Sequence, residues 1–269
     1  MIDATLADGT NAPAEIVKLD GVNVSYQTDH GKVTALGNVD LTIHQGEFVC
    51  VLGPSGCGKS TMLNIIAGFL KPSEGAAYSC GEPITGPDWH RGVVFQTPAL
   101  YPWLNIQDNV AFGPRMRKVP ASEIEPAVAS ALETVGLKDF TTHKPYELSG
   151  GMRQRASLAR ALVSQPDLIL MDEPFGALDA FTRLNMQELI RNIWLKQKRT
   201  VFLITHDVDE ALALATRVIV MSARPGRIVE EIPCDFTYDI SGVNAEAVRY
   251  SHEYAQVREE CLDIINRQR

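Results

Sequence analysis

Runs of apolar residues near the start of the chain predict short β-strands. Residues 15–52 contain the segments EIVKLDGVNVSY, ALGNVDLTI and GEFVCVLG, which alternate apolar and polar positions or are largely apolar, with Gly and Asp turns between them. The last run, Phe48–Leu52, is continuously apolar and enters a Gly-rich turn, as a buried central strand does. The following segment, STMLNIIAGFL, has helical spacing and is expected to end between Gly68 and Pro72.

The middle of the chain, from about residue 97 to 165, has a helical pattern instead. The segment EIEPAVASALETVGL predicts an amphipathic helix that closes at Gly136. Ser122 and Glu125 have the spacing of a capping box, although Pro126 leaves the start of this helix open. A second helix is expected from Met152 to Val163, after the segment LSGG. We interpret this block as a helical insertion.

Strands and helices alternate again from Leu168 onwards. The pattern predicts the strand LILMD, a helix near Ala180–Gln197, the strand VFLIT, a short helix over Glu210–Leu214 and the strand VIVMS. Such alternation is typical of a mainly parallel sheet in an α/β fold. The segment AEAVRYSHEYAQVREECLDIINR predicts a final helix packed on the surface.

Composition is that of an ordinary globular protein, with 45% hydrophobic and 22% charged residues. No stretch approaches the roughly 18 uninterrupted apolar residues that span a bilayer. The start of the chain lacks the pattern of a secretory signal, so residues 1–14 are expected to be a flexible leader. The net charge of −8 argues against nucleic acid as a partner. Five scattered cysteines favour apolar packing in a reducing, cytosolic setting over zinc or disulfides.

A phosphate-binding loop follows the apolar strand. The segment GPSGCGKST matches the pattern GxxxxGK[ST] between a strand and a helix. Its residues are Gly53, Pro54, Ser55, Gly56, Cys57, Gly58, Lys59, Ser60 and Thr61. Backbone N–H groups and the positive end of the helix dipole suit phosphate oxygens. Lys59 can reach the β- and γ-phosphates, and the Ser60 hydroxyl can bind Mg²⁺. The alternative is a Gly-rich turn without a ligand.

Two adjacent acids close the strand LILMD. Asp172 and Glu173 lie at the carboxyl end of a predicted parallel strand, which is the end that faces the phosphate loop. Asp172 suits Mg²⁺, directly or through water, and Glu173 is then placed to polarise an attacking water. The alternative is a solvated strand end that is acidic by chance.

Taken together with these two segments, LSGGM (residues 148–152), Gln96 in VVFQ, the segment Ala177–Asp179 and His206 in LITHD resemble the motifs of ABC transporter ATPases, in the same order. The resemblance covers about residues 15–232. It implies an α/β P-loop NTPase (RecA-like) core with an N-terminal antiparallel β subdomain and an inserted α-helical subdomain at about residues 97–165. Residues 233–269 would then be a short helical C-terminal extension.

The LSGG segment provides a second candidate anion site. Ser149 can cap the helix that follows, and Gly150 and Gly151 expose backbone N–H groups at its positive end. Because the chain already has one phosphate site, we expect the segment of one copy to close over the γ-phosphate held by another. The resemblance implies the same head-to-tail dimer, with ATP at the joint.

The resemblance assigns the remaining roles. Tyr26 would stack on adenine, although a structural strand tyrosine is the alternative. Gln96 would contact Mg²⁺ and the water, His206 would contact the γ-phosphate, and Asp179 would bridge to the opposite phosphate loop. Met152 departs from the Gln that the family usually has, which leaves the expected Ser149 and Gly151 contacts intact.

One branch of the family fits best. The blocks FQTPALYPWLNIQDNVAFG, DEPFGALDAFTR and SARPGRI are similar to the ATPases of nitrate, sulfonate and taurine importers. Tyr101 and Trp103 are expected to be exposed around Pro102, and the family's permease docks in this region, near Ala99–Asn105. The resemblance places the protein at the cytoplasmic face of the inner membrane, with a periplasmic or extracellular substrate-binding protein as an indirect partner. No large regulatory domain is expected after Ile232.

Three other functions compete with this interpretation. A non-transport ABC ATPase usually has long coiled-coil insertions or two fused cassettes, and neither is present. A P-loop kinase for a small molecule would not need the LSGG segment. A binding-only regulator is disfavoured because Lys59, Asp172, Glu173 and His206 are all present. The cargo stays open among taurine, other sulfonates, nitrate and aromatic acids.

Overall fold

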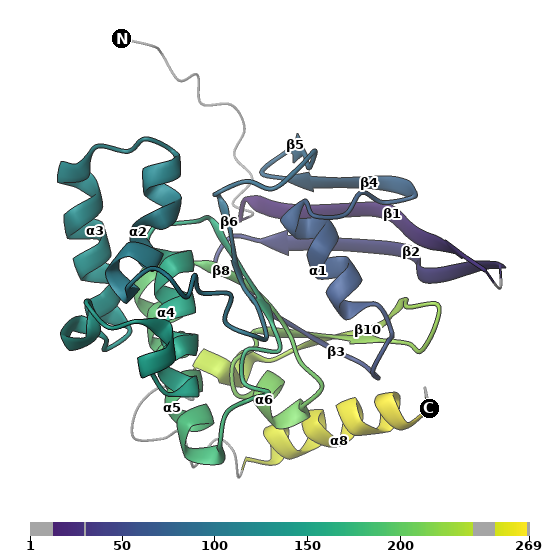
Figure 1. Ribbon diagram of the computed structural model, residues 1–269. Helices are drawn as coiled ribbons and strands as arrows, with labels where there is room; N and C mark the ends of the chain where they lie inside the picture. The colour runs from purple at the N-terminus through teal and green to yellow at the C-terminus, as the bar shows by residue number, and fades with distance from the viewer. Residues whose placement is uncertain (1–12, 30, 239–250, 268–269) are drawn as a thin grey trace.

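Two β-sheets and a group of helices make up the computed structural model, which describes residues 13–29, 31–238 and 251–267 (Figure 1). The smaller sheet is antiparallel, with the strand order β2-β1-β4-β5. Its strands are β1 (Glu15–Thr28), β2 (Gly31–His44), β4 (Glu74–Ser79) and β5 (Glu82–Pro83). Alternate residues of β1 are buried, as expected for a sheet with one face on a core.

The larger sheet has the order β10-β9-β3-β8-β7-β6. Its strands are β3 (Phe48–Leu52), β6 (Arg91–Val94), β7 (Leu168–Asp172), β8 (Thr200–Ile204), β9 (Arg217–Met221) and β10 (Ile228–Pro233). All neighbours are parallel except β10, which pairs antiparallel with β9. The central strands β3 and β8 are buried at every position, which explains their continuous apolar runs.

Each face of the larger sheet is covered by a separate core. Helix α1 (Lys59–Ala67) lies between the two sheets and shares a core with both of them (Figure 1). Buried residues of α2 to α6 and of α8 (His252–Arg267) form the core on the opposite face. The bounds of α5 are Ala180–Gln197 and those of α6 are Val208–Leu212. The predicted α/β fold with an antiparallel β subdomain is confirmed.

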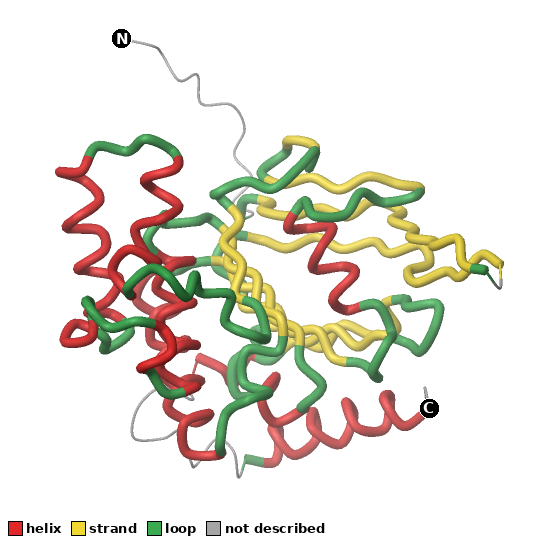
Figure 2. The backbone as a smooth tube through the Cα atoms, viewed as in Figure 1, coloured by secondary structure: helices red, strands yellow, loops and turns green. Residues whose placement is uncertain are grey.

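Three helices extend to one side of the larger sheet (Figure 2). They are α2 (Ile106–Met116), α3 (Ala121–Thr134) and α4 (Gly150–Leu162). The 3₁₀ turns η1 (Lys138–Phe140) and η2 (Pro145–Glu147) lie between α3 and α4, and η3 (Asp235–Tyr238) follows β10. Within the described ranges, no helix has the length and apolar character needed to cross a bilayer.

Several predicted helix limits were wrong. Helix α3 begins after Pro120, so Ser122 and Glu125 lie inside the helix and form no capping box. Helix α4 begins at Gly150, two residues before the predicted start. Helix α6 begins at Val208 because the Asp207 side chain accepts hydrogen bonds from the N–H groups of Asp209, at 2.8 Å, and Glu210, at 3.1 Å.

Two further differences concern the ends and the middle of the chain. Helix α2 was not predicted, because the apolar and aromatic residues of the preceding loop run directly into it and hide its helical periodicity. The predicted final helix is described from His252 onwards, and its first residues lie outside the described part. The leader prediction for residues 1–14 also falls almost entirely outside it.

Candidate functional site

The phosphate loop turns from β3 into α1 through positions where only glycine fits. A Cβ on Gly53 would lie 2.9 Å from Cys57 Sγ and 3.0 Å from the Met221 carbonyl oxygen. Gly58 has a φ of +102°, and a Cβ there would lie 2.6 Å from a methyl carbon of Leu36. The loop is therefore compressed against β2 and β9, which fixes its curvature before any ligand binds.

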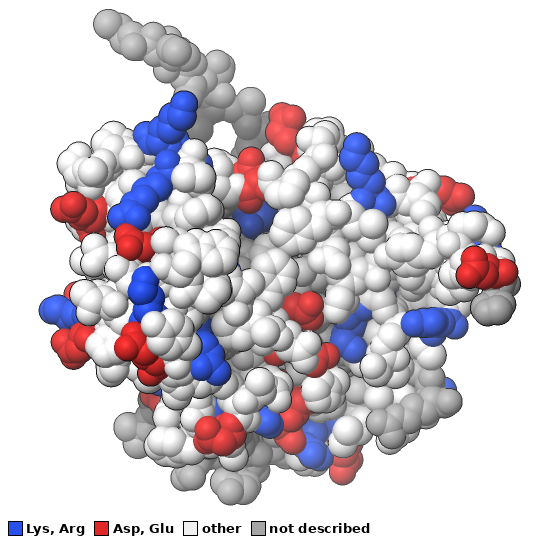
Figure 3. Space-filling view, in the orientation of Figure 1, with Lys and Arg blue, Asp and Glu red and all other residues white. Residues whose placement is uncertain are grey.

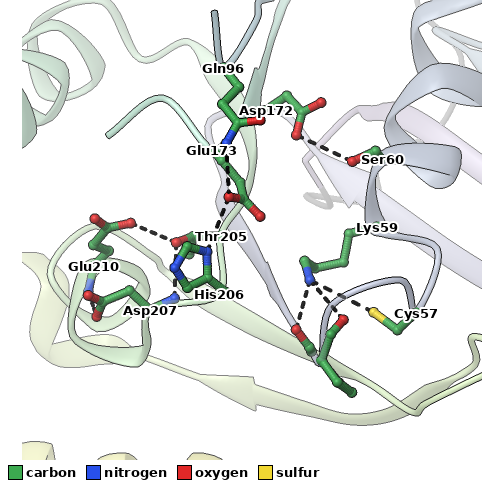
Figure 4. Close-up of polar contacts among 12 residues, drawn as sticks. Cys57, Lys59, Ser60, Gln96, Asp172, Glu173, Thr205, His206, Asp207 and Glu210 are labelled. Atoms are coloured by element: carbon green, nitrogen blue, oxygen red, sulfur yellow. Dashed lines mark hydrogen bonds and ion pairs between the residues drawn. The ribbon is translucent and has the colours of Figure 1, made fainter. Parts of the chain in front are cut away.

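Lys59 is the cation at the centre of this loop. Its side chain is only 6% exposed. The Nζ atom donates hydrogen bonds to the carbonyl oxygens of Gly53, at 2.7 Å, and Pro54, at 3.1 Å (Figure 4). A buried ammonium needs such partners. These two bonds hold the positive charge inside the loop, where phosphate oxygens would compete for it.

Ser60 and Asp172 meet although 112 residues separate them. The Ser60 hydroxyl, in the first turn of α1, donates to Asp172 Oδ1 at 3.4 Å, at the end of β7 (Figure 4). Burial raises the pKa of the Asp172 carboxyl, and the neighbouring Glu173 charge raises it further, while the Ser60 hydrogen bond and Lys59 oppose the rise. A nearby cation would relieve this unfavourable burial.

The two oxygens fit a magnesium ion. Mg²⁺ usually takes one or two protein ligands and completes its shell with phosphate oxygens and water. Ser60 Oγ and Asp172 Oδ1 supply such a pair beside the phosphate loop. Over the part of the chain that the structure describes, no cluster of three or more His, Cys, Asp or Glu side chains could hold a metal alone.

We expect Asp172→Asn to stabilise the nucleotide-free protein at neutral pH. The folded-state pKa of Asp172 lies above the ordinary value of 3.8, so the ionised carboxylate costs stability. This loss of stability is absent below the pKa that Asp172 has in the unfolded chain, and it is fully present at neutral pH. The thermal midpoint of the variant should exceed that of wild type at pH 7, and the difference should shrink as the pH falls towards about 4. A lower midpoint at pH 7 would contradict this account.

Glu173 brings together two residues from distant parts of the chain. Its Oε2 atom accepts a hydrogen bond from Gln96 Nε2 at 3.5 Å and lies 3.2 Å from His206 Nδ1 (Figure 4). The backbone of Glu173 has a φ of +41°, which is strained for a residue with a side chain, and its N–H bonds to the Ile204 carbonyl at 3.0 Å. Strain of this kind is typical of functional positions.

A buried network, which the sequence interpretation missed, supports the loop that carries His206. Thr205 Oγ1 donates to Glu210 Oε2 at 2.6 Å, and the Asp207 N–H donates to Thr205 Oγ1 at 3.1 Å (Figure 4). Glu210 is 6% exposed, and burial raises its pKa. Arg183 Nε lies 3.5 Å from Glu210 Oε1, and Arg183 Nη2 donates a hydrogen bond to the Leu178 carbonyl oxygen at 3.3 Å. The sequence signal that could have revealed this network is Glu210 itself, an acid in the largely apolar segment that follows LITHD.

A cleft of about 500 Å³ opens over the phosphate loop. Its lining comprises Tyr26, Thr28, Val33, Ala35, Ser55, Gly56, Gly58, Lys59, Ser60, Thr61, Glu173 and Arg224. Tyr26 is 44% exposed on β1, which makes its ring available for stacking. Arg224 belongs to the block SARPGRI, which was recognised only as a family likeness; it was given no role in the site because it enters from the loop after β9.

The LSGG segment and Asp179 lie apart from this cleft. Ser149 caps α4 by accepting a bond from the Met152 N–H at 3.3 Å, and Gly150 and Gly151 form its first turn. Asp179 caps α5 through the N–H and hydroxyl of Thr182, at 3.0 Å and 2.6 Å. None of these residues is in the described cleft lining of the same chain. The structure thus brings the phosphate loop, the acids, Gln96 and His206 together, and leaves the second anion site separate.

Comparison with known proteins decides the family. A family model described as "ABC transporter" matches residues 36–176. The chain belongs to the ABC transporter family. It is an ATP-hydrolysing, ATP-binding subunit of the transporter type, as the sequence motifs predicted.

Several curated relatives are similar over almost their whole length. The taurine import ATP-binding protein TauB of Jannaschia sp. is 49% identical over 246 residues, covering 90% of this chain and 92% of the relative. That of Ruegeria pomeroyi is 48% identical over 252 residues, covering 93% of each. A putative ATP-binding protein of Brucella abortus is 50% identical over 232 residues, covering 85% of this chain and 86% of the relative.

Solved structures agree on the fold. A dimeric bacterial ABC transporter cassette in a post-hydrolysis state, bound to ADP and Pi, has a TM-score of 0.72 and 35% identity, and covers 81% of this chain and 99% of its own. The protein cbiO1 of Clostridium perfringens, part of the ABC transporter complex cbiONQ, has a TM-score of 0.75 and 27% identity. The match covers 91% of this chain and 99% of cbiO1. Both likenesses show that this chain has the fold of these proteins.

Proposed function

We propose that this chain is the ATPase of an importer that takes up taurine or a related small anion, another sulfonate or nitrate. The contact of Glu173 with both Gln96 and His206, beside the Lys59 loop, carries the proposal for the chemistry. The taurine importers among its relatives support the cargo class. We assign the ATPase domain to residues 15–232, with a helical part at about 97–165 and a C-terminal extension at 233–269.

The roles of the site residues follow from their positions. Lys59 and the backbone N–H groups of the loop, which residues 53 and 55–61 supply, bind the phosphates, while Pro54 shapes the loop and Tyr26 stacks on adenine. Ser60, Asp172 and Gln96 would hold Mg²⁺, which supplies neutralisation of charge on the phosphate oxygens. Those side chains leave Glu173 free to act on the attacking water.

Glu173 is proposed as the residue that polarises this water. Its carboxylate is oriented by Gln96 and His206, so it can accept a proton or fix the water for in-line attack. His206 would contact the γ-phosphate. The buried Thr205–Glu210 bond keeps the His206 loop in place.

A second copy completes the site. Ser149, Gly150 and Gly151 present a helix N-terminus, but in the described structure they do not line their own chain's cleft. In a head-to-tail pair these N–H groups would close over the γ-phosphate held by the partner, and Asp179 would meet the partner's phosphate loop. The dimeric cassette among the solved relatives supports this arrangement.

A rigid aromatic loop is the proposed docking point for the permease, near Ala99–Asn105. Trp103 is 69% exposed, whereas Tyr101 is half-buried against Phe112, with ring centroids 4.5 Å apart, so the prediction that both are exposed was wrong for Tyr101. Buried Asn109 fixes the loop, since its side chain accepts from the Tyr101 N–H at 2.7 Å and donates to the Tyr101 and Leu104 carbonyls. A fixed, exposed Trp is typical of a binding hot spot.

The surroundings of the docking loop do not favour nucleic acid. On the face drawn in Figure 3, acidic and basic side chains of the described residues are intermixed and uncharged surface predominates. The net charge is −8. We propose a peripheral position at the cytoplasmic face of the inner membrane, through the permease, with a periplasmic or extracellular binding protein as the indirect partner.

We expect tagged Glu173→Gln protein, purified from native membranes with ATP, to recover a multi-span permease. Adding Trp103→Ala should weaken recovery at least ~10-fold, because truncating a central aromatic anchor costs about 2 kcal/mol or more. Quantitative mass spectrometry measures the recovery. The binding protein of the recovered system can then be titrated with taurine, other sulfonates and nitrate.

Val229→Ala provides the control, since Val229 is an exposed apolar residue on β10, away from the docking loop. It should leave recovery unchanged. Recovery of soluble partners only, from an extract in which membrane proteins are demonstrably solubilised, would contradict the transporter role.

A further inference from the structure

The loop between β9 and β10 lies directly against the phosphate loop. The Gly226 N–H donates to the Ala35 carbonyl at 2.9 Å, and the Gly226 carbonyl accepts from the Gly37 N–H at 3.0 Å. A Cβ on Gly226 would lie 1.8 Å from the Cys57 carbonyl oxygen. Residues 222–227 are thus fixed between β2 and the phosphate loop, and their position is set by backbone contacts.

This loop carries Arg224 into the ATP cleft. Arg224 Nε donates to the Gly56 carbonyl oxygen at 2.9 Å. Its guanidinium covers Gly56 so closely that a Cβ there would lie 3.3 Å from Nη2. Arg224 is also among the residues that line the cleft, together with Tyr26 and Val33.

Among the described residues, the charge of Arg224 has no acidic counterpart, since none of the ion pairs includes Arg224. In the part of the cleft lining that the structure describes, the other cation is Lys59, whose Nζ is already bound to the Gly53 and Pro54 carbonyls. One nitrogen of Arg224 is used on Gly56, and the two Nη groups have no hydrogen-bond partner among the described residues.

We propose that Arg224 binds the phosphate groups of the nucleotide and is a further ATP-binding residue of this protein. A guanidinium matches phosphate oxygens through two parallel N–H bonds and is always charged. The bond to Gly56 fixes the side chain in advance, so little entropy is lost when the nucleotide arrives. This inference rests on the assignment of the cleft as the ATP site.

The full-length chain, titrated with ADP and with ATP by calorimetry, tests the proposal. Arg224→Ala should weaken both affinities about 10-fold, equivalent to about 1.4 kcal/mol. The loss should shrink as KCl is raised, because salt screens a contact between exposed charges. Arg227→Ala is the matched control, since it removes the same charge from the same loop but lies outside the described cleft lining. It should change neither affinity by more than about twofold.

Arg224→Lys distinguishes the charge of Arg224 from its hydrogen bond to the phosphate loop at Gly56. Lysine keeps the charge but loses the Nε bond to Gly56 and the paired N–H geometry, so a phosphate contact predicts a loss of affinity smaller than that of Arg224→Ala but larger than that of Arg227→Ala. Equal losses in the Lys and Ala variants would overturn the proposal, and so would no loss in Arg224→Ala or an equal loss in Arg227→Ala.

Failure of the ATP-site assignment would be recognised separately. In that case Lys59→Ala would bind nucleotide as well as wild type. If Lys59→Ala loses binding while Arg224→Ala does not, only the inference on Arg224 fails. The midpoint of thermal unfolding without nucleotide, equal in wild type and Arg224→Ala, excludes a folding defect as the cause of any loss.

Discussion

Glu173→Gln should reduce ATP turnover at least ~10²-fold, equivalent to a rise of roughly 2.7 kcal/mol or more in the barrier. Glutamine preserves the size of the side chain and can still bond to Gln96 and His206, but it cannot accept a proton from water. ATP binding should be retained, because Lys59 and the loop N–H groups are untouched. Phosphate release measures turnover, and size-exclusion chromatography with ATP should show an accumulated dimer.

The control for this variant is Glu188→Gln, which removes an exposed carboxylate on α5. It should turn over ATP at the wild-type rate. Near-normal activity of Glu173→Gln would remove Glu173 from the mechanism. A loss of ATP binding in Glu173→Gln would instead mean that the carboxylate is needed for nucleotide binding and not for hydrolysis alone.

Lys59→Ala should lose nucleotide affinity by about 10- to 100-fold, since a hydrogen bond to a charged group contributes about 1.5–3 kcal/mol. The buried ammonium is held inside the phosphate loop by two carbonyl oxygens, where it is placed to meet the phosphates. Calorimetric titration with ADP measures the loss without interference from hydrolysis.

Two further variants show whether the charge of Lys59 is responsible. Lys59→Met fills the same buried space without the charge and should lose as much affinity as Lys59→Ala. Lys71→Ala removes an exposed lysine just after α1 and should bind normally. Unchanged affinity in Lys59→Met would contradict the phosphate-loop assignment.

Local patterns predicted most of the fold. The continuous apolar runs of β3 and β8 are strands buried at every position, and their five-residue length favours a strand over a helix. Helix α1 ends at Gly68, which has a φ of +81°, where the sequence placed its stop. Errors arose where one side chain decided a boundary, as with Asp207 at the start of α6.

The candidate site was predictable to the extent that its residues belong to contiguous motifs. The segment GPSGCGKST predicts phosphate binding because its curved backbone and the helix dipole that follows are encoded by adjacent residues. The pair Asp172–Glu173 was predicted to lie in the site because it ends a parallel strand. Arg224 and Glu210 were missed. Glu210 belongs to no recognised motif, and Arg224 lies in the block SARPGRI, to which no role in the site was given. Each acts through a contact that the local sequence does not show: Arg224 bonds to Gly56, 168 residues away, and Glu210 bonds to Thr205 inside the core.

Short-range periodicity and residues adjacent in the chain were enough to predict the α/β fold, the family and the phosphate loop. Which groups meet in the site follows from the three-dimensional arrangement of the strands. Gln96 lies 77 residues from Glu173, and Arg224 lies 168 residues from Gly56. Parallel β-strands bring their carboxyl ends to one edge regardless of the length of chain between them, so contacts at that edge follow from strand order, which local patterns do not encode.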